Sequence, residues 1–174
     1  MSAQDLMADA VKRPVEAAEG ALEGVSADTL NHMPQGTRNS MAWLVWHAAR
    51  QQDAQIAQLC GAEQVWTAEG WCNTFDLDRP CDDFGFGDGP EDVARVRVSD
   101  PGMLLGYLRA VACATGEYLR VLDDAALDEI IDDSWDPPVT RGMRIVSTID
   151  DAAQHVGQAA YVRGLVEDGW TGRY

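Results

Sequence analysis

Long apolar runs are missing from this chain. No segment approaches the ~20 consecutive apolar residues that a membrane-spanning helix requires, and the N-terminal stretch lacks the uninterrupted apolar core of a signal peptide. These two absences predict a cytoplasmic protein that does not cross a membrane.

Positive charge is also scarce. Lys and Arg together number 13 against 29 Asp and Glu, which gives a formal net charge of −16 at pH 7. Such a chain repels phosphate backbones and anionic lipid surfaces. We therefore expect no nucleic-acid partner and no membrane partner.

Cysteine is sparse, with four residues and no CxxC pair, which argues against a dithiol redox motif or a thiolate zinc site. Cys60 and Cys113 fall within helical patterns and are predicted to be small core residues. Cys72 and Cys81 fall in a long loop. Because cytosolic thiols are normally reduced, we expect no disulfide between them.

Strand-like alternation is missing as well, whereas apolar residues recur at helical spacing in four long segments. These segments are residues 3–22, 40–61, 100–122 and 142–167. Pro14 is expected to kink the first of them. With 174 residues and 46% apolar composition, residues 1–174 suit a single domain. The fold class predicted is all-α, a four-helix bundle with long crossover loops.

Local signals mark the ends of these helices. Ser40 and Gly61 are typical of the start and the end of the second helix, and Asp100 followed by Pro101 is typical of the start of the third. Between these two helices, residues 62–99 are dense in Gly, Asp and aromatic residues. A loop of this length is usually functional, and its alternative is a partly mobile lid.

Histidine is rare enough for each residue to be considered separately, because there are three. His32 lies in a polar connector and suggests no role. His47 borders the apolar stripe of the second helix, while Asp151 and His155 are four residues apart and share one face of the last helix. Two imidazoles and one carboxylate can ligate a divalent cation and leave positions open for a substrate.

This pattern predicts a metal site formed by His47, Asp151 and His155. The ligand set suits zinc, with nickel, iron and manganese as alternatives. The competing interpretation is structural. In that interpretation the histidines are hydrogen-bonded boundary residues, and Asp151 and His155 form an ordinary solvated pair.

Two segments resemble a known family. MAWLVWHAARQQD, residues 41–53, resembles the second-helix signature of DinB-like proteins, in which a tryptophan-rich turn precedes a metal-ligating histidine. DDAAQHVGQAAYVRGL, residues 150–165, resembles their last-helix signature, in which a histidine or an acidic residue stands four positions before a second histidine. The resemblance spans roughly residues 3–168.

The resemblance implies a DinB-like four-helix bundle, commonly dimeric, with His47, Asp151 and His155 as ligands of a divalent metal. The acidic ligand makes the site similar to that of the mycothiol-dependent maleylpyruvate isomerases, whose zinc activates a low-molecular-weight thiol. The acid expected in those isomerases is glutamate, and it is aspartate in this sequence.

The three candidate ligands and the resemblance together favour a metal-dependent S-transferase that joins a thiol of the mycothiol or bacillithiol type to a small electrophile. The resemblance also implies a homodimer. The alternatives are a metal-dependent hydrolase and a non-enzymatic dimeric bundle that binds a small molecule or a protein. Two residues are predicted to bind substrate: Arg50, with a surface salt bridge as its alternative role, and Trp71, as part of a loop lid.

Overall fold

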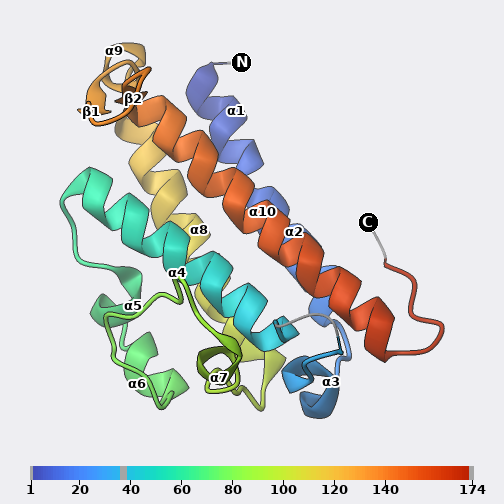
Figure 1. The fold of residues 1–174 in the computed structure, drawn as a ribbon. Helices are drawn as coiled ribbons and strands as arrows, with labels where there is room; N and C mark the ends of the chain where they lie inside the picture. Colours follow the sequence, from blue (N-terminus) through green and yellow to red (C-terminus); the bar gives the residue numbers. More distant parts are fainter. Residues whose placement is uncertain (1, 36–38, 173–174) are drawn as a thin grey trace.

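Four long helices form the body of the protein in the computed structural model, which describes residues 2–35 and 39–172. They are α2 (Lys12–Leu22), α4 (Met41–Cys60), α8 (Pro101–Val121) and α10 (Arg141–Val166). Helices α4 and α2 each contact both α8 and α10, so the four helices form a closed ring (Figure 1). The predicted all-α class is confirmed. None of the helices in the described part of the chain is long and apolar enough to cross a membrane.

The predicted helix ends depend on capping residues that the structure confirms. The Ser40 hydroxyl accepts a hydrogen bond from the backbone N–H of Trp43 at the start of α4. Gly61 ends this helix with a φ of 66°, a left-handed conformation that glycine adopts without strain. Asp100 caps α8 in the same way as Ser40 caps α4, with Pro101 in the first turn. Local chemistry therefore sets where the two helices begin.

The first predicted helix is interrupted near Pro14, as expected. Helix α1 (Ala3–Ala10) ends before Val11, and α2 begins at Lys12. Proline has no N–H to donate, and in a continuous helix its ring would crowd the carbonyl group of residue 10. The segment is therefore two helices, and of these α2 contacts both α8 and α10 in the bundle.

Residues 62–99 cover the face of α4 that the bundle leaves open (Figure 1). This excursion contains three short helices, α5 (Val65–Ala68), α6 (Trp71–Phe75) and α7 (Pro90–Val93). Five of its apolar side chains are buried in the main core: Trp66, Phe75, Val93, Val96 and Val98. As a result, every residue of α4 from 41 to 53 is buried. Over these residues the helix is buried on all sides, and its polar side chains there must find partners inside the protein.

The segment between α8 and α10 contains α9 (Asp124–Leu127) and a short antiparallel hairpin of β1 (Ile130–Asp132) and β2 (Val139–Thr140). These two strands were not predicted from the sequence. The two strands have three and two residues, which is too short for apolar alternation to show in the sequence. The hairpin lies at the end of the bundle where α10 begins (Figure 1). The remaining helix, α3 (Ala27–Asn31), follows α2.

The cysteine predictions are corrected by the structure. Cys72 and Cys81 form a disulfide, with Cα atoms 5.8 Å apart, because α6 and the following turn bring them within bonding range. Cys60 and Cys113 are exposed free thiols and not core residues. Cys60 is the last residue of α4, and Cys113 lies between the buried positions Val111 and Thr115 of α8.

Candidate metal centre

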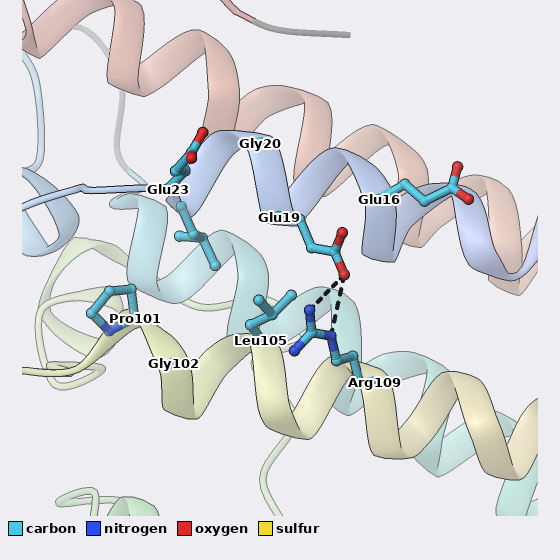
Figure 2. A pocket seen from close by; sticks show the side chains of 9 residues that line it. Glu16, Glu19, Gly20, Glu23, Pro101, Gly102, Leu105 and Arg109 are labelled. Atoms are coloured by element: carbon cyan, nitrogen blue, oxygen red, sulfur yellow. Dashed lines mark hydrogen bonds and ion pairs between the residues drawn. The ribbon is translucent and has the colours of Figure 1, made fainter.

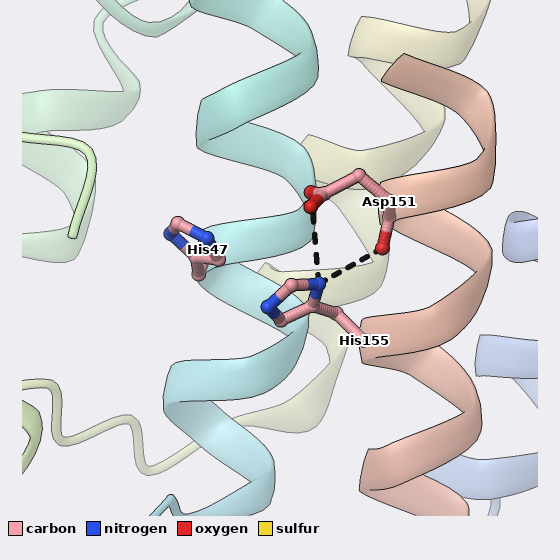
Figure 3. Close-up of side chains that lie close together, drawn as sticks. All are labelled: His47, Asp151 and His155. Atoms are coloured by element: carbon pink, nitrogen blue, oxygen red, sulfur yellow. Dashed lines mark hydrogen bonds and ion pairs between the residues drawn. The ribbon is translucent and has the colours of Figure 1, made fainter. Parts of the chain in front are cut away.

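The three predicted ligands meet between α4 and α10. His47 extends from α4, and Asp151 and His155 extend toward it from one face of α10 (Figure 3). One ligand atom from each residue lies within 4.8 Å of the others, and the two imidazole centroids are 4.7 Å apart. Ligands held ~2 Å from a tetrahedral zinc ion lie ~3.4 Å from one another. Small side-chain rotations would therefore be enough to close this set around a single ion.

Both imidazoles are held by backbone carbonyl groups. His47 Nδ1 lies 2.5 Å from the carbonyl oxygen of Phe84, and His155 Nδ1 lies 2.9 Å from that of Asp151. Because a carbonyl oxygen can only accept a hydrogen bond, each Nδ1 must carry the proton. In the neutral form of either ring, Nε2 then keeps a free lone pair, which is the form that a metal-ligating histidine requires.

The protonation state of His47 also suits a metal ligand. Burial lowers the pKa of His47 below its ordinary value of 6.5, although the hydrogen bond to Phe84 acts in the opposite direction. The neighbouring His155 lowers this pKa further. At neutral pH the His47 ring is therefore neutral and competent to bind a cation.

Asp151 supplies the observation that best tests whether a cation fits. Its Oδ2 atom is buried and has no hydrogen-bond partner among the described residues. The same atom lies 3.6 Å from His155 Nδ1, beyond hydrogen-bond distance. A buried carboxylate oxygen without a donor is costly, and a divalent cation at this point would satisfy it. The donor set of two imidazoles and one carboxylate fits zinc, nickel, iron or manganese.

The site is closed on one side and open on the other. The Trp43 ring stacks on His47 with centroids 4.6 Å apart and planes 8° apart. The side chains of Asp151 and His155, in contrast, remain 40% and 18% exposed. A small ligand can therefore approach the metal position from the α10 side.

Residues 83–88, which we call the strap, lie against His47. Phe84 contributes only its carbonyl group to the hydrogen bond with His47, so no side-chain signal in the sequence could have identified it. Trp43 belongs to the tryptophan-rich turn that precedes His47 in the DinB-like signature. Its place one turn before His47 on α4 is the signal that predicts their contact.

Arg50 is completely buried, so the alternative of a surface salt bridge is wrong. Its guanidinium donates to Gln64 Oε1, to the Tyr107 hydroxyl and to the carbonyl oxygen of Asp83. Trp71 is half-buried, and its ring lies 5.7 Å from that of Tyr107. The substrate-binding roles of Arg50 and Trp71 stay predictions.

A surface groove of about 580 Å³ lies away from the ligands, between α2 and α8 (Figure 2). Arg109 crosses it to form an ion pair of 2.6 Å with Glu19. Its other charged side chains are the glutamates Glu16 and Glu23. None of His47, Asp151 and His155 lines this groove, so the candidate metal centre is separate from it.

Comparisons with known proteins indicate the family of this chain. A family model described as mycothiol-S-transferase matches residues 6–168. A conserved protein of Enterococcus faecalis, solved by crystallography, has 37% sequence identity to this chain and a TM-score of 0.89. The match covers 95% of this chain and 98% of that one. No curated protein matches. The resemblance to DinB-like proteins is confirmed, and the chain belongs to the mycothiol-S-transferase family.

Proposed function

We propose that this protein is a metal-dependent transferase that joins a low-molecular-weight thiol, of the mycothiol or bacillithiol type, to a small electrophile. The observation that carries the proposal is the convergence of two imidazoles and one carboxylate between α4 and α10, with a buried carboxylate oxygen of Asp151 that has no hydrogen-bond partner among the described residues. The family match supports the thiol as the co-substrate.

In the proposed reaction, a thiol RSH and an electrophile R′X give the thioether RSR′ and HX. The sulfur–carbon bond forms, the carbon–X bond breaks, and the thiol proton leaves with X. A bound divalent cation would lower the pKa of a thiol placed on it, which raises the concentration of the nucleophilic thiolate.

The side chains of this protein have separate roles in that reaction. His47 and His155 each offer an Nε2 lone pair, and Asp151 offers negative charge that offsets the charge of the cation. Trp43 and the strap exclude water from one side of His47. The exposed edges of Asp151 and His155 leave room for the thiol and the electrophile.

We further propose zinc as the ion, a homodimer as the assembly and the cytoplasm as the location. The ligand types favour zinc. The resemblance to DinB-like proteins supports the dimer. The cytosol keeps low-molecular-weight thiols reduced, as the proposed co-substrate must be, and the disulfide between Cys72 and Cys81 is a feature that departs from this environment.

The first test measures metal content in protein purified without a histidine tag. We expect about one divalent ion per chain in the wild type and a large loss in His47→Ala. His32→Ala is the matched control, because His32 is exposed and does not belong to the group of His47, Asp151 and His155. Equal metal content in the wild type and His47→Ala would overturn the proposal.

The second test incubates the metal-loaded protein with mycothiol or bacillithiol and the electrophile chlorodinitrobenzene, and measures the thioether by mass spectrometry. We expect product above the uncatalysed rate in the wild type and in His32→Ala, and none above it in His47→Ala. Turnover of an ester panel without any thiol would indicate the hydrolase. Metal binding with no turnover of any substrate would indicate the non-enzymatic bundle.

A further inference from the structure

Arg79 ties the two ends of the strap together. Its side chain is only 4% exposed, and it forms ion pairs with Asp83 at 2.5 Å and with Asp88 at 2.6 Å. It also donates to the carbonyl oxygen of Asp92 at 3.0 Å. Residues 83 and 88 are the first and last of the strap, so one guanidinium fixes both of its ends.

The strap in turn fixes the Nδ1 side of His47. Asp83 Oδ1 accepts a hydrogen bond from the Gly85 N–H, and this turn directs the intervening Phe84 carbonyl group at His47 Nδ1. The backbone approaches closely here. A Cβ atom added at Gly85 would lie 2.9 Å from His47 Nδ1. The carbonyl group can reach the imidazole only because residue 85 is glycine.

Arg79 is also connected, through Asp88, to the side chain that stacks on the face of the same ring. Asp88 Oδ2, which pairs with Arg79, also accepts a hydrogen bond of 2.7 Å from Trp43 Nε1. The Trp43 indole is the ring stacked on His47. Arg79 therefore helps to hold both groups that contact the imidazole: the Phe84 carbonyl group at Nδ1 and the Trp43 indole stacked on its face.

We propose that Arg79 is a positioning residue for His47. By holding the strap, it keeps the proton on His47 Nδ1 and directs Nε2 toward Asp151 and His155. Buried ion pairs add little net stability because desolvation costs offset their attraction. Precise placement of the strap is then the larger benefit of burying this arginine. The consequence for metal affinity rests on the proposed function, whereas the consequence for the His47 tautomer does not.

The test compares the wild type with Arg79→Gln, Arg79→Lys and the control Arg95→Gln. Arg95 is an exposed arginine on the same excursion, so its replacement removes the same charge without disturbing the strap. Two-bond ¹H–¹⁵N NMR of histidine-labelled, metal-free protein reports which ring nitrogen of His47 carries the proton. Zinc titration by calorimetry reports affinity, and circular dichroism reports folding.

We expect His47 to carry its proton on Nδ1 in the wild type and in Arg95→Gln, and to become a mixture of tautomers in Arg79→Gln. Zinc affinity should fall ~10- to 100-fold in Arg79→Gln, as is typical when a group that orients a metal ligand is lost. Arg79→Lys should give an intermediate result, because an ammonium group cannot hold two carboxylates in the fork geometry of a guanidinium.

An unchanged tautomer and unchanged zinc affinity in a folded Arg79→Gln would overturn the inference. If that variant does not fold, the same result in Arg79→Lys would overturn it. A wild type that binds no zinc would contradict the proposed function. In that case a tautomer change confined to the Arg79 variants would still support the positioning role.

Discussion

Two adjacent aspartates on α10 have very different surroundings. Asp150 is exposed, and its Oδ2 accepts a hydrogen bond of 2.6 Å from Gln154. Asp151 has a buried Oδ2 with no partner among the described residues. The chain thus offers a matched pair of carboxylates, of which only one faces the two imidazoles.

Asp151→Asn should therefore weaken zinc binding at least ~10-fold, because it removes the negative ligand while keeping the shape of the side chain. Asp150→Asn should leave affinity unchanged within about twofold, since that carboxylate lies outside the site. Calorimetric zinc titration of both variants checks the prediction. Equal losses in the two would mean that only the overall negative charge attracts the cation.

Tyr107 joins a group of buried polar side chains that extend from α4. Its hydroxyl donates to Asp53 Oδ2 at 2.7 Å and accepts from Arg50 Nη1 at 3.2 Å. Burial raises the pKa of Tyr107 well above its ordinary value of 10.0. The folded protein therefore keeps this proton at a pH where the unfolded chain releases it, and stability falls as the pH rises above 10.

Tyr107→Phe should lower the free energy of unfolding by about 1–3 kcal/mol at pH 8, because the Asp53 carboxylate loses a donor. Its further loss of stability between pH 9 and 11 should be smaller than that of the wild type. Urea unfolding across this range measures both effects. Tyr161→Phe, at an exposed position, is the control. A wild-type-like alkaline loss in Tyr107→Phe would contradict the assignment.

At the scale of elements, the helices were predictable because their signals are local. Ser40 and Gly61 bound α4, and Pro14 separates α1 from α2, through contacts within a few residues in the sequence. The strap was not predictable in the same way. Its contact with His47 joins residues 37 apart through a backbone carbonyl group, which leaves no trace in the residue type of Phe84.

Substitution of two glycines in the strap tests whether the strap holds His47 in place. Gly85 and Gly87 both have positive φ values, 86° and 79°. A Cβ atom at Gly87 would meet nothing within 4 Å, whereas one at Gly85 would lie against His47 and Trp46. Replacement by alanine therefore adds comparable backbone strain at both positions, but it crowds the His47 imidazole only at position 85.

Gly87→Ala should cost about 1 kcal/mol of stability from backbone strain alone, with zinc affinity unchanged. Gly85→Ala should cost about 1–3 kcal/mol more, because the strap or the imidazole must shift, and it should also weaken zinc binding. Chemical unfolding and zinc titration of the two variants separate these effects. Equal zinc affinity in both would show that the strap does not hold the ligand.

At the scale of the whole molecule, the ring of four helices brings two distant parts of the sequence to one point. The prediction that His47, Asp151 and His155 share a site required only that α4 and α10 be neighbours, because the spacing of Asp151 and His155 already places them on one helical face. The complete burial of Arg50 was not predictable. It depends on residues 62–99 folding over α4, and apolar residues in this segment do not recur at a regular spacing that would predict such packing.

The most direct test of the account is the position of a zinc ion in crystals grown with the metal, located by anomalous scattering at the zinc edge. We predict one ion per chain at ~2.0–2.2 Å from Nε2 of His47, from Nε2 of His155 and from a carboxylate oxygen of Asp151. An ion bound elsewhere on the chain, or held by only one of the two histidines, would contradict the account.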